Sequence, residues 1–224
     1  MDLFEAVRQR RSIRGFKPDP VPRDVIMEIL DVTCRAPSAM NIQPWEFLVL
    51  SGDTLDKVRD ANVENLRNGV MPQPEHPPIG WPRDSVYRQR QVELAKGLFS
   101  LLGISRDDQK RRTQWTERGF RFFEAPAAVI LLMDTQLYEP GPLMDIGCAI
   151  QTLCLAAVAK GLGTCIEDQG VMYPDILRRY ANVPEDRRIT MGIAIGYPDP
   201  DYPANKLVTD RQPASEKTTF VGLD

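Results

Sequence analysis

The chain has very little histidine and little cysteine. It contains a single histidine, His76, in 224 residues, which argues against a histidine-based metal site and against a Ser-His-Asp triad. It has only four cysteines, none in a C-x-x-C pair, so a disulfide scaffold is excluded. We expect no metal site. The cysteines stand in apolar stretches and are predicted to be buried, reduced thiols: Cys34, Cys148, Cys154 and Cys165.

The chain also lacks an excess of positive charge and a long uncharged hydrophobic run. Its net charge is −3, so we expect no nucleic-acid partner. The longest apolar stretch, 143–162, contains Asp145 and Lys160 and predicts a buried helix, not a membrane span. The N-terminal residues include an early acid and no apolar core of a signal peptide. These features predict a cytoplasmic protein.

Arginine is concentrated in one short segment near the N-terminus. Arg10, Arg11, Ser12 and Arg14 follow a short amphipathic helix that begins after Asp2. Guanidinium groups donate hydrogen bonds in pairs, which suits a phosphate or another delocalised anion. The ordinary alternative is a set of solvated charges that complement the helix dipole.

A second motif, residues 36–45, combines two prolines with small and amide side chains between a helix and a strand. Amides and hydroxyls on a stiffened loop suit the edge of a flat heterocycle. Alternatively, Asn41 and Gln43 satisfy the loop backbone, and Gln43 and Trp45 hold the loop against the sheet. Together the two motifs predict a site for a phosphorylated aromatic cofactor.

Hydrophobic periodicity predicts strands that alternate with helices, and therefore an α+β fold, an α/β sandwich with a small mixed central sheet flanked by helices. We expect a single domain over 1–224, with 69–123 as a helical insert or lid and 198–224 as a C-terminal arm. The predicted helix at 142–160 is apolar on more than one face, which indicates an obligate homodimer. The expected strands are 47–50, 127–133, 164–167 and 189–195, and the other expected helices are 2–10, 22–36, 54–68, two within 85–123, and 174–182.

The order of the motifs resembles the FMN-dependent nitroreductase family. R-R-S-I-R-x-F is followed by A-P-S-x-x-N-x-Q-P-W-x-F, then by G-L-G-T-C after a long apolar helix, and finally by Arg211 before a proline. The resemblance implies an intertwined homodimer with two FMN sites at the interface. It implies these FMN contacts: Arg10, Arg11, Ser12 and Arg14 from one subunit, Pro37, Ser38, Ala39 and Asn41 from the other, Lys206 or Arg211 at the phosphate, and Ile166 and Glu167 beside flavin N5.

The same resemblance implies that NADH or NADPH reduces the bound FMN by hydride transfer in a ping-pong cycle. A small aromatic acceptor, a nitroaromatic or a quinone, then takes the electrons. No side chain is assigned as a catalytic acid or base, because the cofactor carries the chemistry. We expect Tyr87, Arg88 and Trp115 of the insert to bind the acceptor, since lids beside a rigid cofactor often carry specificity.

Other activities on this fold stay open. One is reductive dehalogenation of halophenols, another is consumption of reduced FMN with oxygen, and a third is a non-enzymatic dimer that stores or senses flavin. The chain departs from many relatives at the N5 loop, where Glu167-Asp168-Gln169-Gly170 replaces a Gly-Gly or Glu-Gly pair. In the tail, Lys206 and Arg211 compete for the phosphate role, and Arg211 is favoured.

Overall fold

A computed structural model describes residues 1–76, 78, 80–137 and 140–222. Its sheet has four strands in the order β1-β2-β4-β3, namely Glu46–Ser51, Ala127–Asp134, Arg187–Gly196 and Gly163–Glu167. The three ladders are antiparallel, and parallel pairing among the described residues is confined to the isolated bridge of Ser12 with Thr164. The α+β fold is confirmed, and the small sheet is more uniformly antiparallel than the expected mixed sheet.

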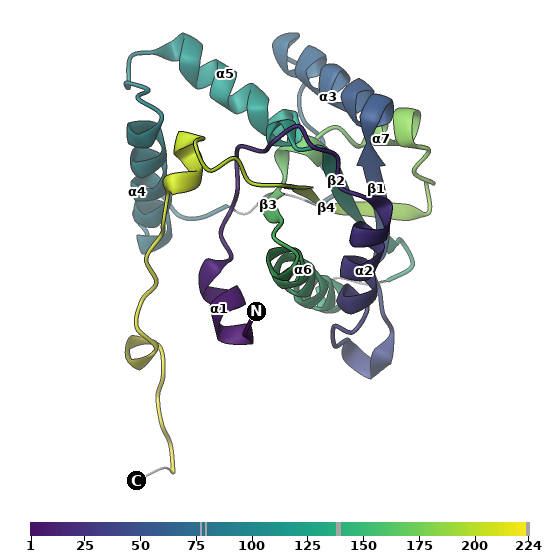
Figure 1. Ribbon diagram of the computed structural model, residues 1–224, viewed down its shortest axis with the longest axis vertical. Coiled ribbons are helices and arrows are strands. Elements are labelled where there is room, and N and C mark those ends of the chain that lie inside the picture. Colours follow the sequence, from purple (N-terminus) through teal and green to yellow (C-terminus); the bar gives the residue numbers. More distant parts are fainter. Residues whose placement is uncertain (77, 79, 138–139, 223–224) are drawn as a thin grey trace.

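The central strand β2 explains why the sheet is covered on both faces. Its alternate residues divide between two cores, with Ile130 in one and Val129 and Leu131 in the other. Because neighbouring side chains of a strand point to opposite faces, an uninterrupted apolar strand needs helices on both sides. Figure 1 shows α2 and α6 on one face of the sheet and α3 and α7 on the other.

The predicted helices are present, and three of them begin at residues whose local chemistry explains the start. The Asp2 side chain accepts a hydrogen bond from the Phe4 N–H at 2.8 Å, and Ser85 caps α4 through the Arg88 N–H at 3.2 Å. Pro142 lies in the first turn of α6, where the missing N–H costs nothing. The helices are α1 Leu3–Gln9, α2 Arg23–Thr33, α3 Gly52–Arg67, α4 Val86–Leu101, α5 Gln109–Phe120, α6 Gly141–Ala159 and α7 Pro174–Ala181.

Helix α6 is long and apolar enough to cross a membrane by length and composition alone, a test that core helices of soluble proteins also pass. In the fold it packs against α2 and β3. Its outward face leaves Met144 72% exposed, and Cys148 and Gln151 are exposed along the same face. A helix that is buried on one side and apolar on the other is suited to a subunit interface.

The prediction of four buried cysteines is correct for Cys154 and Cys165 and wrong for Cys34 and Cys148, which are exposed. Cys148 lies on the outward face of α6, and Cys34 follows the last residue of α2. Apolar neighbours in the sequence predicted burial, but the helix turns these two side chains away from the sheet. All four thiols are free.

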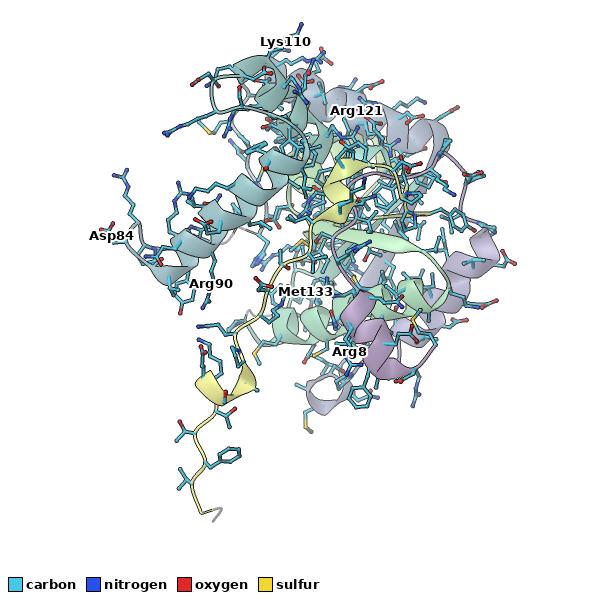
Figure 2. All side chains as sticks on the ribbon, turned by 60° about the vertical axis from the view of Figure 1, so that its left-hand side comes forward. Arg8, Asp84, Arg90, Lys110, Arg121 and Met133 are labelled. Atoms are coloured by element: carbon cyan, nitrogen blue, oxygen red, sulfur yellow. The ribbon has the colours of Figure 1, made fainter. Side chains whose placement is uncertain are left out.

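The C-terminal segment runs along α4 and then leaves the body of the protein (Figure 1). A Cβ on Gly97 would lie 3.2 Å from the side chain of Leu207, and Arg90 of α4 binds the side chain of Gln212 (Figure 2). Between these two contacts Val208 is 74% exposed, and beyond them Phe220 is 71% exposed. The final residues of the predicted arm, 223–224, lie outside the described residues, as do 77 and 79 of the insert.

Candidate functional site

The arginine loop, residues 10–16, is held between the edge strand β3 and the segment that follows β4. The Ile13 N–H donates to the Thr164 carbonyl at 2.9 Å, and Phe16 forms an antiparallel bridge with Pro198. Ile13 and Gly15 are buried, whereas Ser12 and Arg14 between them are only partly buried. Alternation along this extended segment therefore turns Ser12 and Arg14 outward beside the first residues of β3.

Two residues of this loop influence the pKa of the buried Cys165 thiol. Burial raises the pKa of Cys165 to about 12, while the Arg14 charge and a hydrogen bond from Ser12 act in the opposite direction. Burial likewise raises the pKa of Cys154, against the influence of Thr164 and the Arg10 charge. Arg10, Ser12 and Arg14 thus lie next to β3 and α6, and neither thiol is set up as a thiolate nucleophile.

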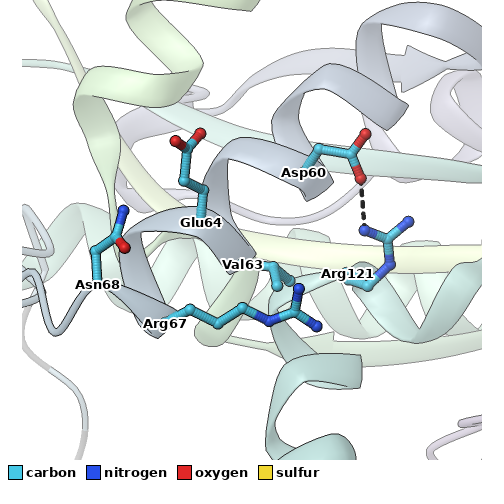
Figure 3. A pocket seen from close by; sticks show the side chains of 6 residues that line it. All are labelled: Asp60, Val63, Glu64, Arg67, Asn68 and Arg121. Atoms are coloured by element: carbon cyan, nitrogen blue, oxygen red, sulfur yellow. Dashed lines mark hydrogen bonds and ion pairs between the residues drawn. The ribbon is translucent and has the colours of Figure 1, made fainter.

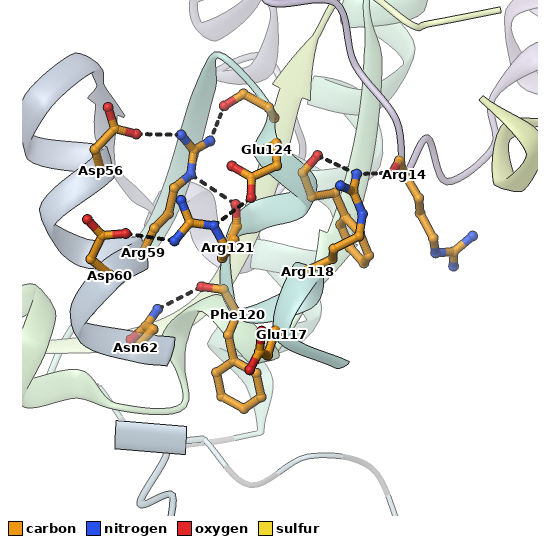
Figure 4. Close-up of polar contacts among 12 residues, drawn as sticks. Arg14, Asp56, Arg59, Asp60, Asn62, Glu117, Arg118, Phe120, Arg121 and Glu124 are labelled. Atoms are coloured by element: carbon orange, nitrogen blue, oxygen red, sulfur yellow. Dashed lines mark hydrogen bonds and ion pairs between the residues drawn. The ribbon is translucent and has the colours of Figure 1, made fainter. Parts of the chain in front are cut away.

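Within the described part of the chain, Arg10, Arg11 and Arg14 make no ion pair with a carboxylate. The Arg14 guanidinium lies 6.0 Å from the centre of the Phe123 ring, and Figure 4 shows it pointing away from the ion pairs around it. Clustered cations with a neighbouring hydroxyl and no internal counter-ion form a donor set that fits a phosphate group. The residues present therefore fit a bound phosphorylated cofactor.

A surface hollow of about 530 Å³ between α3 and α5 is also rich in charge, but its arginines, unlike those of the loop, are paired with carboxylates (Figure 3). Arg121 binds Asp60 at 2.7 Å, and Arg67 forms two hydrogen bonds with Glu117 at 2.7 and 2.8 Å. Its cations are already neutralised by carboxylates of the same chain. This hollow is accordingly not the anion site.

The end of β3 carries a buried acid. Glu167 is 9% exposed, and burial raises the pKa of its carboxyl to about 8. One carboxyl oxygen accepts the Gly170 N–H at 3.0 Å, while the other has no hydrogen-bond partner in the described ranges. Burial also raises the pKa of Asp168, opposed by His76. Ile166, 36% exposed, lies just before this pair on the edge strand.

The second motif forms a strained turn. Met40, Asn41 and Gln43 have φ values of 51°, 59° and 48°, a region that non-glycine residues rarely adopt. The Ser38 hydroxyl accepts the Gln43 N–H at 3.0 Å, and the Gln43 side chain donates to the Asn41 carbonyl at 3.1 Å. These bonds and the burial of Trp45 show that Ser38, Gln43 and Trp45 help to hold the loop, whereas none of the hydrogen bonds found in the described residues uses the Asn41 side chain. The turn nevertheless presents Met40 95% exposed.

The structure places the two N-terminal motifs at different ends of α6. The Ala39 N–H donates to Asp145 near the start of the helix at 3.2 Å, whereas the Ile13 N–H donates to the carbonyl of Thr164, five residues after the helix ends at Ala159. Asp145 and Ala159 are 14 residues apart, which is about 21 Å along a helix axis. Within one chain, the arginine loop and the 36–45 motif therefore face separate regions.

The expected acceptor residues of the insert do not come together. Tyr87 is 60% exposed and lines a hollow of about 610 Å³ that also includes Trp81 and Leu94. Trp115, by contrast, packs on the core, with its ring centre 5.8 Å from that of Phe123. Arg88 binds Gln91 on the same helix and does not line the hollow.

The two tail cations occupy different environments. Lys206 directly follows Asn205, whose side chain binds the backbone of Arg14. Arg211 is exposed, and its guanidinium bonds only within the tail, to Thr209 and the Asp210 carbonyl. Lys206 is therefore beside the arginine loop of its own chain, and Arg211 lies on the segment that extends away.

Sequence reasoning missed two residues that shape the site, Asn205 and Arg118. Asn205 is 3% exposed and binds the arginine loop, and Arg118 donates to the Arg14 carbonyl at 3.1 Å. Neither belongs to a recognisable motif. Asn205 stands 190 residues from Gly15, so no local pattern relates them.

These features define an α+β protein with an arginine-rich loop beside the edge strand of its sheet. A family model described as the nitroreductase family matches residues 7–197, and the chain belongs to that family. The nitrobenzene nitroreductase of Ectopseudomonas oleovorans is 34% identical over 98% of this chain and 96% of its own length.

Two solved structures are similar throughout. One is an FMN- and NADPH-dependent nitroreductase, NfnB, from Sphigopyxis sp. strain HMH, with a TM-score of 0.94 and 29% identity over all of both chains. The other is the FMN-dependent nitroreductase NfnB from Mycobacterium smegmatis in complex with NADPH, with a TM-score of 0.90 and 30% identity. The match covers 98% of this chain and 100% of that structure.

Proposed function

We propose that the protein is an FMN-dependent NAD(P)H oxidoreductase that reduces a small aromatic acceptor, a nitroaromatic or a quinone. The observation that carries this proposal is the arginine loop, whose cations have no carboxylate partner in the described residues and which pairs with the first residues of the edge strand β3. Membership of the nitroreductase family and the FMN-dependent relatives support the same assignment.

Arg10, Arg11, Ser12 and Arg14 would bind the phosphate and the pyrimidine edge of FMN. Fixed guanidinium groups favour the negative charge that the ring system gains on reduction. The backbone of Ile166 and Glu167, at the end of the edge strand, would supply an N–H near N5. Bound FMN supplies the hydride-transfer chemistry between the nicotinamide and the acceptor, and the protein holds two flat rings face to face.

We propose further that each site is built from two subunits of a homodimer. The arginine loop and the 36–45 motif lie at separate ends of α6, so Pro37, Ser38, Ala39 and Asn41 would reach the FMN of the partner. Three apolar surfaces support this arrangement, because each is exposed in the single chain: the outward face of α6, helix α1 with Phe4 69% exposed, and the tail with Phe220 71% exposed.

The tail gives each of its cations a separate role in such a dimer. Lys206 would serve the phosphate site of its own subunit, whereas Arg211, on the outlying arm, would approach the site of the partner. Tyr87 and Trp81, on the hollow of the insert, offer rings against which an aromatic acceptor would stack. We retain Arg88 only as a cation near the start of α4, and Trp115 as a core residue that supports the insert.

The test is an anaerobic titration of the purified protein, supplied with FMN, with NADH and NADPH in turn. We expect the absorbance of oxidised FMN near its visible maximum to be lost with at least one nicotinamide. Mixing the reduced protein with nitrobenzene or a quinone should restore the absorbance rapidly.

The same experiment separates the alternatives. Rapid reoxidation by a halophenol alone would indicate reductive dehalogenation, and loss of the flavin itself with oxygen would indicate cofactor consumption. Reduction that no acceptor reverses would indicate flavin storage. If the protein neither retains nor takes up FMN, the proposed function is wrong.

A further inference from the structure

The side chain of Asn205 uses all four of its hydrogen-bonding positions, three of them on the arginine loop. Its carbonyl oxygen accepts the N–H groups of Arg14 at 2.7 Å and Gly15 at 3.2 Å. Its amide group donates to the carbonyls of Gly15 at 2.7 Å and Asp199 at 2.8 Å. Asn205 is 3% exposed, so water does not compete for these bonds.

The carbonyl of Arg14 is the one backbone group of residues 14–15 that Asn205 does not bind, and Arg118 donates to it. One of its terminal nitrogens donates to the Arg14 carbonyl at 3.1 Å and to the Phe123 carbonyl at 3.2 Å. Figure 4 shows the Arg118 guanidinium reaching the loop from α5. Because α5 belongs to the insert, Arg118 connects the insert directly to the arginine loop.

The side chain of Tyr202 packs against both Arg118 and Gly15. Its ring lies 4.9 Å below the Arg118 guanidinium, and a Cβ on Gly15 would lie 2.1 Å from its Cγ atom. Only glycine allows the loop to approach this ring so closely. The backbone of residues 14–15 is consequently enclosed by Asn205, Arg118 and Tyr202, which come from the tail and the insert.

We infer that Asn205 is a positioning residue of the cofactor site, which, together with Arg118, fixes the backbone of Arg14 and Gly15 so that the arginine side chains are preorganised for the phosphate of FMN. This inference depends on the proposed FMN site. In an extended segment, the backbone orientation determines which side chains face outward, so a held backbone keeps Ser12 and Arg14 turned toward the ligand. A binding loop that is already ordered spends less of its binding energy on ordering.

The first test replaces Asn205 with leucine, which has a similar size and cannot form hydrogen bonds. In the protein without FMN, we expect the amide hydrogens of Arg14 and Gly15 to exchange with solvent faster than in the wild type. FMN affinity, measured by quenching of FMN fluorescence, should fall about tenfold, equivalent to about 1.4 kcal/mol.

Thr190→Val is the matched control, since it removes another buried hydrogen bond from a side chain to the backbone, that from Thr190 to the Leu131 carbonyl at 2.9 Å. It should lower the urea midpoint without changing either the Arg14 and Gly15 exchange or the FMN affinity. If Asn205→Leu loosens the loop but binds FMN as tightly as the wild type, Asn205 has only a structural role and the inference is overturned.

Arg118→Lys is the second variant. It keeps the charge but shortens the side chain, which withdraws the nitrogen that donates to the carbonyls of Arg14 and Phe123. We expect about a threefold loss of FMN affinity with faster exchange at the amides of the loop, and this variant decides the matter if Asn205→Leu does not fold. Unchanged FMN affinity in Arg118→Lys would contradict the inference. Failure of the wild type to bind FMN would instead overturn the proposed function, and the exchange rates would still report whether Asn205 holds the loop.

Discussion

The molecule has two arginine-rich regions that use the same side chain in opposite ways. Arg59 and Arg67 of α3 and Arg121, which follows α5, all bind carboxylates of their own chain. Figure 4 shows the pairs of Arg59 and Arg121. In the arginine loop, Arg10, Arg11 and Arg14 bind none of the carboxylates in the described residues. The difference separates arginines that build the fold from arginines that are left to bind a ligand.

Arg59 shows what a structural arginine does here. It is 6% exposed, binds Asp56 at 2.8 Å, and donates to the carbonyls of Arg121, at 2.9 Å, and Ala125. These two carbonyls flank the turn at 122–124, in which three consecutive non-glycine residues have φ values of 52°, 51° and 60°. A strained turn persists only where its surroundings hold it in place.

The largest expected effect comes from removing that support. Arg59→Ala should lower the free energy of unfolding by about 3 kcal/mol, because it leaves buried carbonyls without donors beside a strained turn. Urea denaturation followed by circular dichroism measures the change. A loss below about 1 kcal/mol would mean that the turn does not depend on Arg59.

The second prediction concerns the loop. Arg14→Ala should weaken FMN binding by about 10- to 100-fold, as expected for the loss of a hydrogen bond between two charged groups, and should change stability without FMN very little. Fluorescence titration measures the affinity, with Arg67→Ala as the control that removes an arginine from the other region. Equal affinities for the two variants would break the distinction between the two regions.

Much of the fold could be predicted from the sequence, because its signals are local. The uninterrupted apolar run at 127–133 predicted β2, Asp2 predicted the start of α1, and Pro142 predicted the start of α6. Antiparallel pairing within the sheet is a property of long-range topology, which periodicity does not record. The prediction of buried thiols was correct for Cys154 and Cys165 and wrong for Cys34 and Cys148. Periodicity does not record how a helix is rotated relative to the sheet, and this rotation decides which thiol faces solvent.

The residues of the candidate site likewise fall into two groups: those that a local sequence pattern reveals and those that only long-range contacts bring to the site. The arginine loop and the 36–45 motif are each a short, continuous stretch of sequence, so both could be proposed as cofactor contacts from residue type alone. Asn205 and Arg118 could not, because each acts on Arg14 from a distant part of the chain. Trp115 was predicted as an acceptor contact from its residue type alone, and only packing against Phe123 shows that its ring supports the core.

The third prediction extends the comparison to carboxyl groups. Glu117, whose pKa is lowered chiefly by its hydrogen bond with Arg67, contrasts with Glu167, whose pKa is raised to about 8 by burial. Between the ordinary value near 4.5 and about 8, the folded state binds more protons at Glu167 than the unfolded state does. Its contribution to stability is therefore complete below about pH 4.5 and is lost as the pH rises through 8.

Glu167→Gln cannot ionise, so its stability relative to the wild type should increase from pH 5 to pH 8 by on the order of 1–3 kcal/mol. Urea midpoints at three pH values within that range measure the trend. Glu117→Gln is the control, since its lowered pKa places the change below pH 4.5 and predicts no trend in this window. A flat difference for Glu167→Gln would show that the carboxyl is ionised in the folded protein throughout.

The smallest effect is expected for Arg67, the most exposed of the three arginines that pair with carboxylates. The Arg67 side chain is 66% exposed, although it forms two short hydrogen bonds with Glu117. Water and salt screen such a pair, and holding two long side chains in one geometry costs entropy, so Arg67→Ala should leave the urea midpoint close to that of the wild type. The midpoint should also respond little to added sodium chloride. If Arg67→Ala destabilises the protein as much as Arg59→Ala, then pairing with a carboxylate, and not burial against backbone carbonyls, is what makes an arginine structural in this fold.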